Sequence, residues 1–470
     1  MVLDIDDKPH EECGVFGIFD RTVSAVYEAY YGIFALQHRG QESAGMTITD
    51  GTNMETFRGM GLVTEVFRDL PQKEGHIGIG HVRYSTTGSS IPANVQPLQA
   101  SSIDGDIAIA HNGNLINTEH LRRRLLLEGS TFQTSMDTEV IIKLLARSRR
   151  SGMEEKVKEL MDEIHGAYSL VACTGEALYG CRDPFGYRPL VLGKTESGWA
   201  LASETAALDA ISAEFVRDIR PGEIVTITDD GVRSAMYCDE ASHPHGICSF
   251  EYIYFARPDS VMNGQDIYQA RLDMGRRLWE ETRYDGDVVM SVPDSGNVAA
   301  LGYSQASGIP FAEGLLKNKY MGRTFIQPGQ KNRERAVRMK LNPIRMNVKG
   351  KRIILVDDSI VRGTTSGIII RLLRQAGAKE IMLCISSPPV RYPCFFGIDT
   401  AERKQLIAAR YSLEDIRKSI GADKLHYLSE AGLADSISHI KQSDLCFACF
   451  NGRYPEPIMP GGLEKTDDEE

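Results

Sequence analysis

One segment in the second half of the chain constrains the fold more than any other. It reads RIILVDDSIVRGTT over residues 352–365, an apolar run followed by two adjacent aspartates and a loop with one glycine and two threonines. A helical stretch follows at 366–375. A continuous apolar run between polar turns, followed by a helix, is typical of a strand that is covered on both faces. The second half is therefore predicted to be an α/β domain with a parallel sheet.

The polar residues of this segment indicate a phosphate site. Backbone N–H groups and hydroxyls at the start of a helix bind phosphate, and ligands of open α/β sheets bind at the carboxyl ends of the strands. Asp357 and Asp358 stand at that end. Another apolar run, 287–292, leads into Pro-Asp-Ser-Gly at 293–296 and then a helix at 298–305. A second anion site is therefore expected on the same side of the sheet.

The first half of the chain has a different pattern. Alternating strands are predicted at 77–83 and 105–110, and a hairpin closed by an Asp-Gly turn at 224–235. An amphipathic helix is predicted at 138–150. This is an α+β pattern, and it changes to alternating strands and helices near residue 243. We expect domains over 13–242 and 243–458.

Cys13 starts the first informative stretch of that half. Alone, a cysteine followed by glycine and an apolar strand reads as a buried thiol. Three further motifs follow in order, LQHRGQE at 36–42, GHVRYST at 80–86 and HNGNL at 111–115. Together they resemble the glutamine amidotransferase domain of the N-terminal-nucleophile hydrolases. The resemblance implies an αββα sandwich.

The resemblance also implies a role for each matching residue. Cys13 would be the nucleophile and its own α-amino group the base, which requires removal of residues 1–12 as a propeptide. Asn112 and the backbone N–H of Gly113 would form the oxyanion hole. Arg83 would bind the α-carboxylate of glutamine, and Asp137 its α-ammonium. From the sequence pattern alone, Asp137 reads instead as the N-cap of the following helix.

The Asp-Asp–Gly-Thr-Thr segment resembles the phosphoribosyl-pyrophosphate loop of type I phosphoribosyltransferases. By this resemblance Asp357 and Asp358 would contact the ribose hydroxyls and a Mg²⁺ ion, with Ser295 near the metal. The basic, aromatic stretch 317–328 resembles the flexible loop that closes over the sugar. The residues expected to bind the 5-phosphate are Arg362, Gly363, Thr364 and Thr365.

Both halves on one chain, in this order, resemble the amidophosphoribosyltransferase family. The implied reaction converts glutamine, phosphoribosyl pyrophosphate and water to 5-phosphoribosylamine, glutamate and pyrophosphate, the first committed step of purine synthesis. Ammonia would pass inside the protein from Cys13 to the sugar. The resemblance further implies a homotetramer that purine nucleotides inhibit.

The cysteines fit one branch of this family. Nine cysteines in a long chain without an export signal argue against a disulfide framework. A C-x₂-C pair lies near the end of the chain. One branch carries both a propeptide and a [4Fe–4S] cluster, and a zinc site that includes His243 or His245 is the alternative. The positions that match the ligands of the cluster are Cys248, Cys394, Cys446 and Cys449.

Composition excludes several other classes of protein. The net charge of −11 argues against a nucleic-acid surface. No apolar run approaches the roughly 18 residues of a membrane helix, and the acidic N-terminus is no secretory signal. We therefore expect a cytoplasmic protein without nucleic-acid or membrane partners. Residues 459–470 read as a disordered acidic tail.

Three alternative functions fit parts of the pattern. A glutaminase could feed another acceptor, as in glucosamine-phosphate or asparagine synthesis, but neither reaction needs a phosphoribosyl-pyrophosphate loop. A regulator that senses this sugar would need a DNA-binding face, which the charge argues against. A free-standing glutaminase with a vestigial partner domain would not need the complete set of Ser295, Asp357, Asp358 and 362–365.

Overall fold

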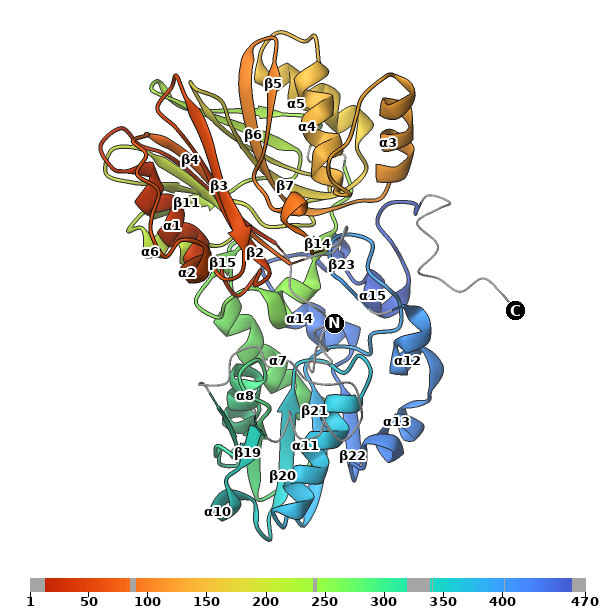
Figure 1. The fold of residues 1–470 in the computed structure, drawn as a ribbon. Helices are drawn as coiled ribbons and strands as arrows, with labels where there is room; N and C mark the ends of the chain where they lie inside the picture. The colour runs from red at the N-terminus through yellow and green to blue at the C-terminus, as the bar shows by residue number, and fades with distance from the viewer. Residues whose placement is uncertain are drawn as a thin grey trace.

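The computed structural model describes residues 13–84, 90–239, 243–318, 339, 341–400 and 402–458. The predicted propeptide (1–12), the predicted acidic tail (459–470) and residues 319–328 of the predicted closing loop lie outside this set. The chain forms two halves, one above the other in Figure 1.

The first half contains two antiparallel sheets. The seven-stranded sheet has the order β11-β9-β10-β1-β4-β2-β3, and the six-stranded sheet has the order β13-β12-β8-β7-β6-β5. The strands of the first are β1 (Gly14–Phe19), β2 (Ser43–Thr49), β3 (Met54–Met60), β4 (Ile77–Arg83), β9 (Val191–Lys194), β10 (Trp199–Ala202) and β11 (Glu214–Asp218). Those of the second are β5 (Leu98–Ser102), β6 (Gly105–Leu115), β7 (Gly166–Cys173), β8 (Leu178–Arg182), β12 (Glu223–Thr228) and β13 (Gly231–Met236).

Helices cover the outer faces of these sheets. Apolar side chains of the two inner faces, such as Val15 and Val171, pack together in one core. Separate cores lie under the helices on either side, so the predicted αββα sandwich is confirmed. The first sheet carries α1 (Ala25–Ala35), α2 (Val63–Val66) and α6 (Thr205–Ala210), and the second carries α3 (Thr118–Leu127), α4 (Asp137–Arg147) and α5 (Met153–Glu163).

The second half contains the predicted parallel sheet, in the order β17-β20-β21-β22. Successive residues of β20, such as Ile353 and Ile354, enter cores on opposite faces of the sheet. Both faces are therefore covered, which explains the continuous apolar runs. The strands are β17 (Val288–Ser291), β20 (Arg352–Asp357), β21 (Glu380–Ile385) and β22 (Lys424–Tyr427). The main helices are α7 (Ile267–Thr282) and α8 (Asn297–Ser307) on one face and α11 (Thr364–Gln375) and α13 (Leu413–Ile420) on the other.

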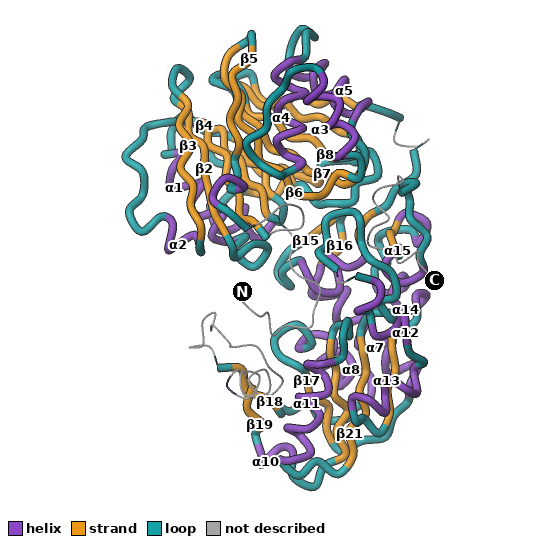
Figure 2. The backbone as a smooth tube through the Cα atoms, turned by 45° about the vertical axis from the view of Figure 1, so that its right-hand side comes forward, coloured by secondary structure: helices purple, strands orange, loops and turns teal. Residues whose placement is uncertain are grey.

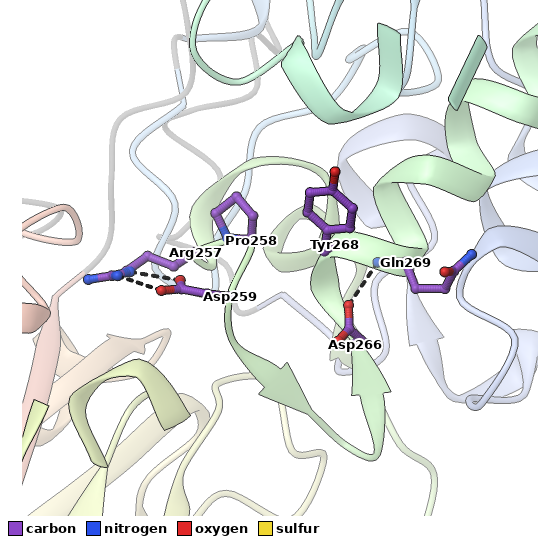
Figure 3. Close-up of a pocket in the computed structure, with 6 residues that line it drawn as sticks. All are labelled: Arg257, Pro258, Asp259, Asp266, Tyr268 and Gln269. Atoms are coloured by element: carbon purple, nitrogen blue, oxygen red, sulfur yellow. Dashed lines mark hydrogen bonds and ion pairs between the residues drawn. The ribbon is translucent and has the colours of Figure 1, made fainter. Parts of the chain in front are cut away.

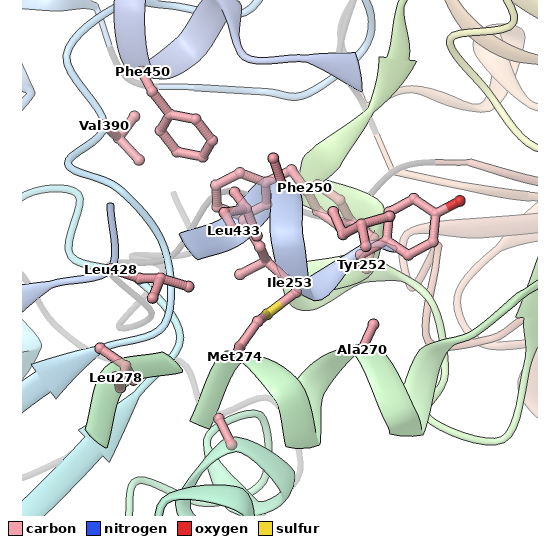
Figure 4. Close-up of a cluster of buried hydrophobic side chains, with 14 of the residues drawn as sticks. Phe250, Tyr252, Ile253, Ala270, Met274, Leu278, Val390, Leu428, Leu433 and Phe450 are labelled. Carbon is pink, nitrogen blue, oxygen red and sulfur yellow. The ribbon is translucent and has the colours of Figure 1, made fainter. Parts of the chain in front are cut away.

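Short elements complete this half, and some of them lie where the halves meet. Figure 2 shows β15 and β16 at this level. A π-helix, η3 (Glu251–Phe255), packs on α7, and Figure 4 shows Ile253 of η3 directed toward Met274 of α7. The other short elements are β14 (Ile247–Cys248), β15 (Val261–Met262), β16 (Gln265–Asp266), β18 (Leu315–Lys317), β19 (Leu341–Pro343), α10 (Arg345–Val348), α12 (Ile407–Arg410), α14 (Glu430–Ser436), β23 (Leu445–Cys446) and α15 (Ala448–Asn451).

Several boundaries differ from the sequence prediction. The helix predicted at 138–150 spans Asp137–Arg147, and the helix predicted at 298–305 spans Asn297–Ser307. Strand β6 continues five residues beyond the predicted end at 110, because β7 supplies pairing partners as far as Leu115 opposite Gly166. Helix α11 begins at Thr364, two residues earlier than predicted, because Gly363 takes the left-handed conformation at its start. Within the described ranges, no helix is both long and apolar enough to span a bilayer.

Candidate functional site

Cys13 lies immediately before β1, at the end of the sandwich that faces the second half. Its side chain is buried, and Sγ lies 3.5 Å from the backbone oxygen of Tyr84. Burial raises the pKa of the Cys13 thiol to about 11, although the Arg83 guanidinium opposes the rise. The thiol is therefore protonated near neutral pH, and a nucleophilic role requires a base beside it.

Two of the predicted glutamine-binding residues lie next to this thiol. Arg83, at the end of β4, is buried, and the charges of Arg83 and Asp137 both act on the Cys13 thiol. Asp137 accepts hydrogen bonds from the backbone N–H groups of Leu115 (3.1 Å) and Thr138 (2.8 Å). Burial alone would raise the pKa of Asp137, but the His111 ring and these N–H groups hold it below its usual value.

The alternative reading of Asp137 as an N-cap is wrong. The N-cap of α4 is Met136, and Asp137 is the first residue of the helix. Its carboxylate reaches β6 at Leu115 as well as the adjacent Thr138 N–H. Asp137 therefore fixes the helix to the strand that carries Asn112.

Asn112 and Gly113 lie side by side in β6. Asn112 is 1% exposed, and neither polar atom of its amide has a hydrogen-bond partner among the described residues. A buried amide without a partner is costly unless a ligand completes it. Gly113 has φ +146°, and a Cβ there would lie 2.0 Å from the backbone oxygen of Ala167. Only glycine fits at this position, where β6 lies close against β7.

The predicted phosphate loop joins β20 to α11. Asp357 and Asp358 are buried at the carboxyl end of β20. The N–H of Asp358 donates to the Asp357 carboxylate at 2.9 Å, and Ser359 Oγ donates to the Asp358 carboxylate at 2.8 Å. The loop residues Arg362, Gly363, Thr364 and Thr365 lead into the first turn of α11, where Gly363 has φ +79°.

The second predicted anion loop lies beside the first. The N–H of Val292 donates to the backbone oxygen of Val356 at 2.8 Å. A Cβ on Gly296 would lie 2.6 Å from that same oxygen, so the two loops approach as closely as backbones can. Ser295 therefore lies in a loop that abuts Asp357, and the structure brings the predicted metal-binding residues to one edge of the sheet.

The four predicted cluster ligands gather between the halves. Strand β14 pairs in parallel with β23, which places Cys248 opposite Cys446. Burial raises the pKa of the Cys248 thiol to about 11 and that of Cys446 further, and each thiol also responds to the charge of Cys394. The pKa of the Cys449 thiol is also raised, first by burial and then by the charges of the other three thiols.

The histidines of the zinc alternative make other contacts. His243 packs edge-on against Phe185, with ring centroids 4.7 Å apart, and His245 lies 4.0 Å from the Asp444 carboxylate. Over the described ranges, no three histidine, cysteine, aspartate or glutamate side chains are arranged to hold a single metal ion.

A separate hollow of about 840 Å³ opens near the start of α7. Figure 3 shows Arg257 paired with Asp259 on one side, and Asp266 accepting a hydrogen bond from Gln269 on the other. None of the predicted site residues is among those that line it. We assign it no role in the reaction.

Sequence reasoning missed the residue that holds the backbone of Cys13. Arg39 is fully buried and donates from Nε to the backbone oxygen of Cys13 at 3.1 Å. Its position inside the LQHRGQE motif could have indicated that Arg39 belongs to the site. Its partner Glu251, in the second half, stands in no motif that we recognised.

Comparisons with known proteins match both halves. A sequence family described as a glutamine amidotransferase domain matches residues 81–210, and one described as a phosphoribosyl transferase domain matches residues 264–388. Amidophosphoribosyltransferase from Synechococcus elongatus is 49% identical over 464 residues, covering 97% of this chain and 94% of the relative. The Bacillus subtilis enzyme of the same name is 47% identical over 456 residues, covering 96% and 95%.

A solved structure matches nearly the whole fold. It is glutamine phosphoribosylpyrophosphate amidotransferase from B. subtilis, complexed with ADP and GMP. It is 46% identical to this chain, covers 95% of it and 98% of its own length, and superposes with a TM-score of 0.90. The relative arrangement of the two halves is thus shared with that structure.

Proposed function

This chain belongs to the amidophosphoribosyltransferase family, and we infer from its two sites how it carries out the family's reaction, the first step of purine biosynthesis. It converts glutamine, 5-phosphoribosyl 1-pyrophosphate and water to 5-phosphoribosylamine, glutamate and pyrophosphate. The observation that carries this function is the presence, in one folded chain, of the buried Cys13 site and the Asp357–Asp358 phosphate loop.

The glutamine site works through Cys13. Its α-amino group takes the thiol proton, and the thiolate attacks the side-chain amide carbon of glutamine. Asn112 and the Gly113 N–H stabilise the oxyanion, a role that the unpartnered Asn112 amide supports. The protonated amine then gives its proton to the leaving ammonia, and water hydrolyses the thioester to glutamate. Arg83 binds the α-carboxylate of the substrate and Asp137 its α-ammonium.

The second site transfers the phosphoribosyl group. Ammonia forms a bond to C1 of the sugar as the bond from C1 to pyrophosphate breaks. The loop 362–365 holds the 5-phosphate at the start of α11. Asp357 and Asp358, with Ser295 nearby, would hold Mg²⁺, which when bound neutralises the charge that develops on pyrophosphate. We propose that ammonia passes between the sites inside the protein, since bulk water would protonate and dilute it.

Pyrophosphate release tests this function. We expect release from phosphoribosyl pyrophosphate and Mg²⁺ to depend on glutamine, in protein purified without oxygen. That dependence would join the two half-sites into one enzyme. Absence of release with either glutamine or ammonia, in protein whose N-terminus is confirmed as Cys13, would contradict the proposal and favour a sensor of the sugar phosphate.

We propose that residues 1–12 are removed as a propeptide. The support is chemical, because a thiol with a pKa of about 11 needs a base, and a free α-amino group titrates near 7.7–8. An intact-mass spectrum of active enzyme should show a chain that begins at Cys13. The glutamine-dependent rate should also rise with pH through that range, as the amine loses its proton. Residues 1–12 retained in active enzyme would contradict the proposal.

We propose that Cys248, Cys394, Cys446 and Cys449 hold a [4Fe–4S] cluster. Their fit rests on four mutually interacting thiols, a donor set that suits iron–sulfur chemistry. Protein purified without oxygen should be brown and contain about four iron atoms per chain. Stoichiometric zinc in place of iron would contradict the cluster and support the zinc alternative.

We also propose that purine nucleotides inhibit this enzyme and that it acts in the cytoplasm as a homotetramer. The support for inhibition is the solved B. subtilis relative, which is complexed with ADP and GMP. Sedimentation of the purified enzyme with and without GMP tests the assembly, and initial rates at increasing GMP test the inhibition.

A further inference from the structure

A buried ion-pair network lies behind Cys13. The three guanidinium nitrogens of Arg39 donate to three different groups. Nε reaches the backbone oxygen of Cys13 at 3.1 Å, Nη1 reaches Glu204 at 2.6 Å, and Nη2 reaches Glu251 at 2.7 Å. All four residues are buried. The planar guanidinium is thus fixed by two carboxylates, and its third donor points at the nucleophilic residue.

Each half of the molecule contributes one of these two carboxylates. Glu204 precedes α6 in the first half, whereas Glu251 begins the π-helix η3 in the second. Burial alone would raise the pKa of Glu204, but His38 and Arg39 hold it well below its usual value. Burial alone would lower the pKa of Arg39, and Glu251 and Glu204 raise it instead. The network is therefore charged, and losing Glu251 would leave the buried Arg39 with Glu204 as its remaining carboxylate partner.

The position of Glu251 is set by the second half. Arg271 of α7 donates to the backbone oxygens of Tyr252 (2.9 Å) and Ala256 (2.7 Å) and so fixes η3 along its length. Arg271 also interacts electrostatically with Asp358 of the phosphate loop. Figure 4 shows Tyr252 and Ile253 of η3 in the apolar core above α7. Arg271 thus links the phosphate loop to the segment that carries Glu251.

The carbonyl of Cys13 matters because of where Cys13 stands. Once residues 1–12 are removed, the residue has a chain neighbour on one side only. Its carbonyl is then the backbone group nearest the thiol and the amine that can be anchored. A donor held at 3.1 Å from that oxygen restrains rotation of the nucleophile and its base.

We propose that Arg39 is a positioning residue for Cys13 and that Glu251 of the second half sets its orientation. The glutamine site is then complete only when the phosphoribosyltransferase half is docked on it. This inference rests on the proposed role of Cys13 as the nucleophile. Arg39 contacts the backbone of Cys13 and lies outside the set that binds glutamine.

The test compares Glu251→Gln and Arg39→Lys with the wild-type holoenzyme. Glutamine keeps the shape of residue 251 without its charge, and lysine keeps the charge of residue 39 without the planar fork. Because a displacement of about 1 Å costs about 100-fold in rate, kcat with glutamine should fall between about 10- and 100-fold in each variant. The KM for glutamine should stay within about twofold, since Arg83 and Asp137 are untouched. Ammonia-dependent synthesis should stay within about twofold as well.

A second readout follows the thiol directly. The rate at which an electrophilic glutamine analogue alkylates Cys13, followed by mass spectrometry, should fall in parallel with kcat. Glu414→Gln is the matched control, because Glu414 is an exposed partner of Arg417 in the same half; it should leave every parameter unchanged.

Two outcomes would overturn the inference. Unchanged kcat with glutamine in Glu251→Gln would show that Glu251 does not act on Cys13. An equal fall in glutamine- and ammonia-dependent synthesis would show that the network only holds the fold. Wild-type enzyme that uses ammonia but neither glutamine nor the analogue would instead refute the proposed role of Cys13, and this inference with it.

Discussion

Replacing Cys13 by alanine should abolish synthesis of 5-phosphoribosylamine from glutamine. Loss of the nucleophile in a covalent mechanism lowers kcat by about 10⁶-fold, which places the residual rate below detection. Ammonia-dependent synthesis should stay within about twofold of wild type, because Cys13 lies in the sandwich and the phosphate loop lies in the second half. Parallel assays with glutamine and with ammonium chloride at high pH measure both rates.

Cys173→Ala is the matched control for this experiment. Cys173 is a fully buried thiol in β7 of the same half, and its pKa is raised by burial to about 12. The Cys173→Ala variant should retain both activities, although a small cavity should lower its stability. If Cys13→Ala lost both activities, the two half-reactions would not be separable and the assignment of Cys13 to the glutamine step alone would be wrong.

The parts of the fold that the sequence predicted well are those with local causes. The apolar runs that lead to Asp357 and to Ser295 are covered on both faces, and each ends in a tight loop before a helix. Because strand, loop and helix follow one another within about 25 residues, the local sequence contains nearly all the signals that determine this strand–loop–helix unit. The strand–loop–helix unit at 352–375 was therefore predictable from residue types and order.

Asp137 shows where local reasoning fails. An aspartate before an amphipathic helix is usually a cap, and nothing in the residues around 137 distinguishes the two roles. Its carboxylate accepts from the N–H of Leu115, 22 residues away, as well as from that of Thr138, because α4 packs on β6. The prediction that Asp137 belongs to the glutamine site came from the resemblance to a family and not from the helix pattern.

The groups that join the two halves were the least predictable. Arg39 and Glu251 are 212 residues apart, and Glu251 stands in a π-helix that no apolar period predicts. The C-x₂-C pair at 446–449 was visible as a spacing, but Cys248 reaches it through the pairing of β14 with β23. Contacts of this kind depend on how two finished domains dock, which short sequence patterns do not encode.

Asp357→Asn should remove phosphoribosyl transfer with either nitrogen source. The change keeps the shape of the side chain and removes one of two adjacent carboxylates at the end of β20. A metal that stabilises the leaving group contributes several kcal/mol, and about 4 kcal/mol corresponds to roughly a 10³-fold lower rate. Pyrophosphate release with glutamine and with ammonia should therefore fall together, whereas hydrolysis of glutamine by the Cys13 site, measured as glutamate, should persist.

Asp287→Asn separates a catalytic effect from a general one. Asp287 precedes β17 at the opposite, amino-terminal edge of the sheet and pairs with Arg352 at 2.9 Å. Its loss removes a carboxylate from the same sheet without touching the loops at the carboxyl edge, so both activities should remain near the wild-type rate. Equal rates in Asp357→Asn and wild type would refute the metal and ribose role of Asp357. Because the two aspartates differ in which end of the parallel sheet they occupy, a loss confined to Asp357→Asn would place the chemistry at the carboxyl edge, where the βα loops converge.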